Sequence, residues 1–273
     1  MSPHETLFLE STNTLDIHYI ANNNLVKFQT WDFGGDCDLN SNDVVYMGKQ
    51  ISFETIFKLA NTLVYVIDAQ EEDYQDDLPK LVETISTAHN INPKLHFEVF
   101  LNKVDGEMSE ETKAERQQGI QQFVSSELSE NNRDDELLVS YFLTSIYDHS
   151  ALEAFSRVVQ KLVPQLPTLN SLLDAFIASC TVEKSYLVDV VTKLYIATDS
   201  NPIDAKTYEL CTDLVDVVID VSHIYGVNKS DGQLVTFDDK STAAIRLNTG
   251  KFHSILAHFF LLLLPSTLHC TVH

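Results

Sequence analysis

The sequence predicts an α/β fold built on a mostly parallel sheet, followed by a smaller α+β domain. Thr62–Asp68 is a nearly continuous run of apolar and β-branched residues, as expected of a strand buried on both faces. Strand-like and helix-like stretches then alternate as far as Val163. Polar motifs stand at the ends of three predicted strands, which is where open α/β sheets bind ligands. These motifs are Asp32–Gly35, Asn102–Asp105 and Thr144–Ile146.

Before this alternation the sequence predicts a β-hairpin. Thr14–Ile20 and Leu25–Trp31 alternate between apolar and polar residues, and Asn22–Asn24 between them is typical of a turn. We expect a polar loop after Gly35 and then a short helix within Ile51–Ala60. After Thr62–Asp68, the expected order is helix, strand, helix, strand and helix, over residues 74–89, 95–101, 110–128, 137–143 and 152–163.

Prolines mark the end of the first predicted domain, residues 1–163. Pro164 and Pro167 define a linker over residues 164–168, because proline removes backbone donors and ends helices. A different pattern follows, with helices and paired strands in an α+β order. These elements are expected over 169–178, 185–198, 204–225, 233–237 and 243–247, within a second domain of residues 169–248.

Composition argues against several classes of function. The net charge of −22 disfavours direct binding to nucleic acid or to an anionic membrane surface. The four cysteines are scattered without a CxxC pair, which indicates a reducing compartment. The first five residues do not resemble a signal peptide, and the apolar run Ile255–Leu264 is short of the ~20 residues that a membrane-spanning helix needs.

The stretch Leu25–Asp36 contains the first candidate site. Its strand ends at Asp32, whose carboxylate could hold a magnesium ion directly or through water. Gly35 has no side chain, so its backbone N–H can approach a terminal phosphate. An ordinary strand-to-loop turn accounts for the same residues, and this motif alone does not decide between the two interpretations.

The motif Asn102-Lys103-Val104-Asp105 indicates guanine recognition. The Asp105 carboxylate can accept hydrogen bonds from the N1–H and the 2-amino group of guanine, an edge that adenine lacks. Asn102 can bond to the ring, and the stem of Lys103 can lie over the base. A charged surface loop is the alternative, but the position directly after a buried strand favours a nucleotide site.

Thr144-Ser145-Ile146 follows the next predicted strand and is informative only through that position. Its backbone N–H groups could reach the base carbonyl. The residues His269, Cys270 and His273 lack a fourth ligand and a rigid element, so we predict no metal site there. No histidine is arranged with serine or cysteine for nucleophilic catalysis, and we assign no catalytic residue.

Seven stretches closely resemble the Rag GTPases of the C/D branch, over roughly residues 1 to 248. They are Ser2–Thr12, Phe28–Phe33, Tyr65–Gln70, Phe97–Phe100, Lys103–Gly106, Phe142–Ser150 and Tyr195–Ser200. The resemblance implies a Ras-like P-loop GTPase domain followed by a roadblock-type dimerisation domain. It implies GTP or GDP with Mg²⁺ as ligands. The implied contacts are Thr12 and Asp32 for the metal, Gly35 for the third phosphate, and Asn102, Lys103, Asp105, Ser145 and Ile146 for the base.

The resemblance also implies partners and a location. Members of this branch form heterodimers with an A/B-type Rag GTPase. The dimer is held at the lysosomal surface by a scaffold complex, has no lipid anchor of its own, and signals amino-acid sufficiency to the target-of-rapamycin complex. We therefore expect a cytoplasmic protein that reaches the lysosome through its partners.

Three departures from the family pattern affect these expectations. No G-x-x-x-x-G-K-[S/T] motif occurs in the sequence, so we expect the family's first strand and phosphate loop to be missing and Met1 to match an internal methionine. Gly34-Gly35-Asp36 stands where the branch usually has Pro-Gly-Gln, which predicts no fast intrinsic hydrolysis. Residues 249–273 form a divergent apolar tail. Because several phosphate contacts would be lost with the phosphate-loop motif, we predict negligible GTP binding by the isolated chain. The alternative to a nucleotide-binding subunit is a dimerisation or scaffold product that binds no nucleotide, or a truncated gene model.

Overall fold

A computed structural model of the chain shows two compact units. The structure describes residues 10–20, 27–35, 37, 43–46, 48–71, 74–105, 108–130, 137–180, 184–189, 192–203, 205–225, 242–248, 252–258 and 267–272. The first unit comprises residues 1–21, 27–162 and 267–273, and the second comprises residues 22–26 and 163–266. Each unit is described by itself below.

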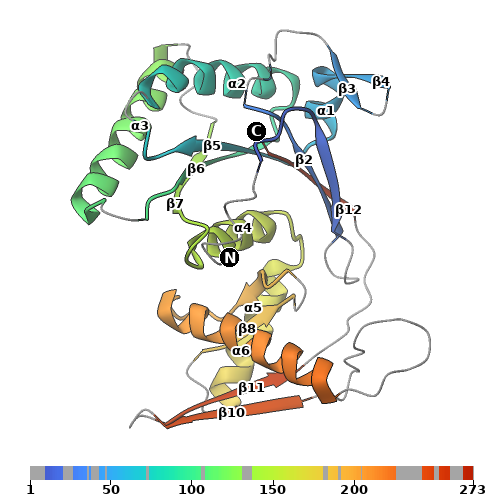
Figure 1. The fold of residues 1–273 in the computed structure, drawn as a ribbon, viewed down its shortest axis with the longest axis vertical. Coiled ribbons are helices and arrows are strands. Elements are labelled where there is room, and N and C mark those ends of the chain that lie inside the picture. The colour runs from blue at the N-terminus through green and yellow to red at the C-terminus, as the bar shows by residue number, and fades with distance from the viewer. Residues whose placement is uncertain are drawn as a thin grey trace. The chain divides into compact units, whose positions relative to one another are not determined.

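A six-stranded sheet with the order β1-β2-β12-β5-β6-β7 lies at the centre of the first unit (Figure 1). Strand β1 is antiparallel to β2, and each of the other neighbouring pairs is parallel. The strands are β1 (Asp16–Ile20), β2 (Lys27–Asp32), β5 (Thr62–Asp68), β6 (His96–Asn102), β7 (Val139–Thr144) and β12 (Thr267–Val272). The predicted α/β fold with a mostly parallel sheet is confirmed.

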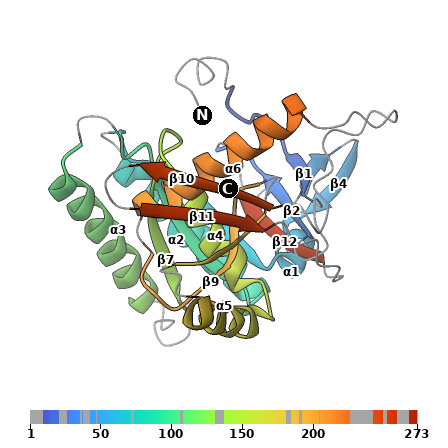
Figure 2. The same ribbon diagram turned by 90° about the horizontal axis from the view of Figure 1, so that it is seen from below.

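Strand β12 comes from the region that the sequence analysis described only as an apolar tail. It pairs with the whole of β2, from Thr267 opposite Lys27 to Val272 opposite Asp32. Its last three residues also pair with the start of β5. Both views show β12 alongside β2 (Figures 1 and 2). Local periodicity could not reveal this strand, because its pairing partners lie near the other end of the sequence.

Helices cover both faces of this sheet (Figure 1). The larger core includes Leu63 of β5, with 1% of its surface exposed, together with Leu81 and Ile120 from two helices. On the other face, Val64 of β5 is 0% exposed and packs with Phe100 and with α4. Adjacent residues of β5 are therefore buried on opposite faces, which explains the continuous apolar run. The helices are α1 (Phe53–Leu59), α2 (Leu78–Ile91), α3 (Glu110–Glu130) and α4 (Ser150–Lys161), with a 3₁₀ turn at Tyr74–Asp77.

The region after the Gly34-Gly35 turn is more ordered than expected. We predicted a polar loop there, but β3 (Asp43–Tyr46) and β4 (Lys49–Ser52) form an antiparallel hairpin. Gly48 makes its turn with φ of 76°, a conformation that glycine adopts without steric cost. Ser52 then caps α1 by accepting a hydrogen bond from the Thr55 N–H at 3.3 Å.

Within its described residues, the second unit combines two helices with two antiparallel strand pairs, β8 with β9 and β10 with β11. Helix α5 begins at Leu166, so Pro167 lies in its first turn, where a missing N–H has no helical partner to lose. The partner of the predicted strand 243–247 is residues 252–258, and the predicted strand 233–237 lies outside the described residues. The elements are α5 (Leu166–Cys180), β8 (Tyr186–Val188), β9 (Tyr195–Thr198), α6 (Ala205–Tyr225), β10 (Thr242–Asn248) and β11 (Phe252–His258).

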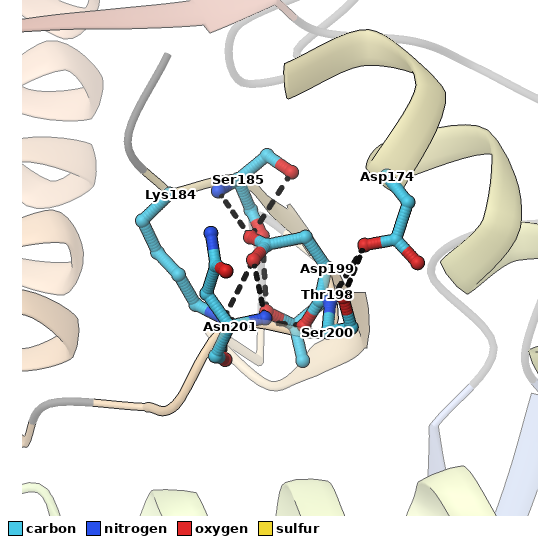
Figure 3. Close-up of polar contacts among 7 residues, drawn as sticks. All are labelled: Asp174, Lys184, Ser185, Thr198, Asp199, Ser200 and Asn201. Carbon is cyan, nitrogen blue, oxygen red and sulfur yellow. Dashed lines mark hydrogen bonds and ion pairs between the residues drawn. The ribbon is translucent and has the colours of Figure 1, made fainter. Parts of the chain in front are cut away.

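Aromatic and polar contacts hold these elements together. The ring of Tyr208 on α6 packs edge-on against Tyr195 of β9, with ring centroids 5.0 Å apart. Asp174 of α5 accepts hydrogen bonds from the N–H and the hydroxyl of Ser200, at 2.7 and 2.9 Å (Figure 3). Throughout the part of the chain that the structure describes, no helix has the length and apolar character needed to cross a membrane.

Candidate functional site

The candidate site lies along the carboxyl-terminal edge of the parallel strands. Strands β2, β5, β6 and β7 run in the same direction, so the loops that follow them share one edge of the sheet. The end of β2 is three strand spacings from the end of β6, or about 14 Å across the sheet. The two ends are also staggered, because Asp32 is level with Glu98 and Asn102 lies four residues further along β6.

Thr12 and Asp32, the two residues predicted to hold magnesium, are in contact. The Thr12 hydroxyl donates a hydrogen bond to Asp32 Oδ2 at 2.8 Å. Both residues are half-buried, and both offer the hard oxygen atoms that Mg²⁺ prefers. Among the described residues there is no group of three or more His, Cys, Asp and Glu side chains that could hold a metal. The pair therefore fits a Mg²⁺ ion that takes its remaining ligands from water or phosphate, as this ion commonly does.

The two glycines after Asp32 have different surroundings. A Cβ atom on Gly34 would lie only 2.5 Å from the carbonyl oxygen of Thr12, so a side chain there would push the two segments apart. A Cβ atom on Gly35 would meet nothing within 4 Å, so its backbone stands in open space. The Lys80 ammonium of α2 donates a hydrogen bond to the Gly35 carbonyl at 2.5 Å. Sequence reasoning missed Gly34 and Lys80, and Asp36 lies outside the described residues.

The ends of β6 and β7 bring Asn102 and Thr144 together. These residues are paired across the two strands, and the Thr144 hydroxyl donates a hydrogen bond to Asn102 Oδ1 at 3.2 Å. The N–H of Val104 donates to the Thr144 carbonyl at 3.3 Å. Asn102 thus ties the loops after β6 and β7 together.

Asp105 and Ser145 form the next contact along this edge. The Ser145 hydroxyl donates a hydrogen bond to Asp105 Oδ1 at 2.8 Å, which fixes the direction of the carboxylate. We expected the backbone N–H of Ser145 to face a base, but it donates to the Ser150 hydroxyl at 2.8 Å. Ile146 is half-buried in the same turn.

Lys103 has an unusual backbone conformation and a partner that the sequence analysis did not name. Its φ of 63° lies in the left-handed region, which costs a residue with a side chain about 1–2 kcal/mol. Its ammonium lies 2.5 Å from Oδ2 of Asp68, the last residue of β5. Burial opposes ionisation of Asp68, but hydrogen bonds from Lys103 and from the N–H groups of Gln70 and Glu71 hold its pKa below the usual value. Two sequence signals pointed to Asp68: it ends a buried strand, and it lies in the stretch Tyr65–Gln70, which resembles the family.

Comparison with known proteins identifies the class to which this fold and this arrangement of residues belong. The description "Gtr1/RagA G protein conserved region" matches residues 1–215. The chain belongs to the Gtr1/RagA family of G proteins.

Several relatives place the chain on the C/D branch of that family. It is 50% identical over 248 residues to human "Ras-related GTP-binding protein C", covering 91% of this chain and 59% of that protein. It is 48% identical to mouse "Ras-related GTP-binding protein D" over 91% of this chain and 53% of the relative. Identity to Schizosaccharomyces pombe "GTP-binding protein gtr2" is 44%, over 91% and 76% of the two chains. The predicted resemblance to Rag C/D GTPases is confirmed, and the chain spans about 60% of the length of the mammalian C relatives.

Proposed function

We propose that the chain is a Rag C/D-type subunit that binds guanine nucleotide with Mg²⁺ and acts as a molecular switch. The observation that carries this proposal is the coupled pair of contacts at the ends of β6 and β7. Asn102 meets Thr144 there, and Asp105 meets the Ser145 hydroxyl at 2.8 Å. A carboxylate held in one direction can accept both donors of the guanine edge, which adenine does not offer.

Each predicted residue has a role in this proposal. Asp105 reads the guanine edge, and the other base-site residues position the ring. Thr12 and Asp32 hold Mg²⁺, and the exposed backbone of Gly35 approaches the third phosphate. The ion would neutralise charge on the phosphates. The remaining base-site residues are Asn102, Lys103, Ser145 and Ile146.

The proposed partner is an A/B-type Rag GTPase, with which the chain would form a heterodimer. Large apolar side chains are exposed on two helices of the second unit, the region where the family resemblance implies a roadblock-type dimerisation domain. The dimer would sit at the lysosomal surface through a scaffold complex and signal amino-acid sufficiency to the target-of-rapamycin complex. The exposed side chains and their exposed fractions are Leu172 (62%) and Phe176 (45%) on α5, and Val217 (49%) and Val221 (48%) on α6.

Competition between GDP and ADP tests the nucleotide part of the proposal. The sequence has no Gly-rich phosphate-binding motif, so we expect affinity weaker than micromolar, measured by NMR titration with Mg²⁺. We still expect GDP to bind at least about tenfold more tightly than ADP, because the base contacts are independent of that motif. Asp105→Ala should remove this preference, and Asp220→Ala, an exposed change on α6, should keep it. Equal affinities for GDP and ADP would overturn the proposal.

A second candidate function is a dimerisation or scaffold subunit that binds no nucleotide. The lack of a G-x-x-x-x-G-K-[S/T] motif in the sequence favours it. Co-expression with an A/B-type Rag and pull-down separates the two functions. A stable heterodimer from a chain that shows no guanine preference would support the scaffold function alone.

A further inference from the structure

Asp68 lies beside the proposed base site without belonging to the predicted set of residues. It is the last residue of β5 and pairs with Asn102, which in turn pairs with Thr144. Three neighbouring strands therefore end at the same level of the sheet. The side chains at that level connect the loop after β5 to the loops that carry the base-site residues.

The two carboxylate oxygens of Asp68 have different partners. Oδ1 accepts the backbone N–H of Gln70 at 2.9 Å, which closes a local turn at the end of the strand. Oδ2 accepts a hydrogen bond from the Lys103 ammonium at 2.5 Å. Because the turn fixes the orientation of the carboxylate, the side chain can hold Lys103 in one place.

The loop after Asp68 is itself anchored on both sides. The Ala69 N–H donates to the Asn102 carbonyl at 2.8 Å. Arg116 of α3 donates hydrogen bonds to the carbonyls of Ala69 and Glu71, the second at 3.2 Å. The anchor for Lys103 is therefore a fixed point of the fold and not a mobile surface carboxylate.

Lys103 needs such an anchor. Its side chain is 54% exposed and its backbone is left-handed, at a position between Asn102 and Asp105. A lysine has four rotatable side-chain bonds and loses much conformational freedom when it is held in one rotamer. The pair with Asp68 removes that freedom before any ligand arrives, which favours binding by preorganisation.

We propose that Asp68 is a positioning residue for guanine recognition: it holds Lys103, and through Lys103 the Asn102–Asp105 loop, in the geometry that receives the base. Asp68 acts through Lys103 and does not contact the nucleotide. This inference rests on the proposed guanine-binding function.

A double-mutant cycle on the full chain tests this role. Asp68→Asn should raise the dissociation constant for GDP about tenfold, because it removes the charged partner of Lys103. Lys103→Met should have a similar effect, and the double variant should be no worse than either single variant. Asp68→Glu, which keeps the charge, should recover most of the affinity. Glu54→Gln is the matched control, since it breaks an exposed 2.5 Å lysine–carboxylate pair on α1.

The melting temperature separates positioning from loss of fold. We expect Asp68→Asn to melt within about a degree of the unchanged chain, because exposed pairs contribute little to stability. Additive losses of affinity in the cycle, or unchanged GDP binding by Asp68→Asn, would overturn the proposal.

Amide hydrogen exchange gives a readout that does not need a nucleotide. Should the unchanged chain show no guanine preference, the function proposed above fails, and exchange over residues 103–105 still decides the role of Asp68. Faster exchange there in Asp68→Asn than in the unchanged chain and in Glu54→Gln would support it. Equal exchange in the three proteins would overturn it.

Discussion

The two units each contain a lysine paired with a carboxylate that has no exposed surface. In the first unit, Lys161 Nζ lies 2.7 Å from Glu98 Oε1. In the second unit, Lys184 Nζ lies 3.2 Å from Asp199 Oδ1. Both pairs join a lysine to a buried carboxylate, but the environments of the two carboxylates differ.

The difference lies in the remaining hydrogen bonds. Asp199 also accepts the backbone N–H groups of Ser185 at 2.7 Å and Asn201 at 2.9 Å, so donors converge on it from several sides (Figure 3). Glu98 Oε2 is buried and has no hydrogen-bond partner among the described residues. Burial raises the pKa of Glu98, and Lys161 offsets this only in part. Burial also acts against ionised Asp199, but the Ser185, Asn201 and Lys184 donors outweigh it and lower its pKa. The comparison shows that the full set of donors, and not the lysine alone, decides whether a buried carboxylate stabilises the fold.

The largest expected effect comes from removing the well-satisfied carboxylate. Asp199→Ala should lower the free energy of unfolding of the second unit by about 3–5 kcal/mol. The variant leaves Lys184, whose side chain is only 11% exposed, without its counter-charge. Urea denaturation, with hydrogen exchange over β8 and β9 to assign the transition, measures this change. Asp220→Ala, at an exposed position on α6, should stay within about 0.5 kcal/mol. Equal effects of the two substitutions would show that the hydrogen bonds to Asp199 do not stabilise the second unit.

Replacing both members of a pair with apolar side chains should give a smaller individual effect, with opposite signs for the two pairs. Glu98→Met combined with Lys161→Met should be neutral or stabilising by about 1–4 kcal/mol, because it also removes the unpartnered Glu98 oxygen. Asp199→Leu combined with Lys184→Met should remain destabilising by about 1–3 kcal/mol, because backbone N–H groups lose their acceptor. Denaturation midpoints of the two double variants provide the test. A stabilised second unit would contradict this account.

The pH dependence of stability should have opposite signs at the two carboxylates. The folded-state pKa of Glu98 is raised, so its contribution is fully present below the unfolded value of 4.5 and is lost as the pH rises through the folded value. The folded-state pKa of Asp199 is lowered, so its contribution is present above 3.8 and is lost as the pH falls through the folded value.

Denaturation between pH 4 and pH 8 checks the sign at Glu98, with Asp199 as the comparison that should not respond in this range. Lowering the pH towards 4.5 should stabilise the unchanged chain relative to Glu98→Gln. Over the same interval, the difference between the unchanged chain and Asp199→Ala should stay nearly constant, since Asp199 titrates below it. If the unchanged chain instead gained stability relative to Glu98→Gln as the pH rose, the sign assigned to Glu98 would be wrong.

Local sequence patterns predicted most of the elements that carry these pairs. The alternation of strand and helix patterns predicted β5, β6, β7 and their helices from local signals, such as the apolar run of Thr62–Asp68 and the helical spacing over residues 74–89. The motifs at the strand ends also follow from that order, since parallel strands bring their carboxyl ends to one edge. The hairpin of β3 and β4 was missed because its polar residues mask a weak strand pattern. Strand β12 was missed because pairing over such a sequence separation leaves no local trace.

Contacts between side chains were less predictable than the elements. The sequence indicated Thr12, Asp32 and Asp105 as ligand residues, and whether they bind ligands stays a prediction. The contact of Thr12 with Asp32, and that of Ser145 with Asp105, depend on how segments far apart in the sequence pack together. Asp68 was missed because a lone carboxylate after a buried strand has many ordinary explanations. Glu98 Oε2 lacks a hydrogen-bond partner within the described part of the chain because of the way β6 and α4 pack, and no short sequence motif encodes that packing.

The smallest effect is expected at a pair that is not buried. Arg157 lies 3.0 Å from Glu153 one turn earlier on α4, and their side chains are 46% and 25% exposed. Glu153→Gln should lower the free energy of unfolding by about 0.3–0.5 kcal/mol, because water screens the pair and holding two long side chains costs entropy. This loss should shrink further in 1 M salt, where the screening length falls to about 3 Å. The same salt should leave the effect of Asp199→Ala largely unchanged, because no solvent reaches that carboxylate. A salt-sensitive Asp199→Ala, or a salt-insensitive Glu153→Gln, would show that exposure does not separate the two kinds of pair.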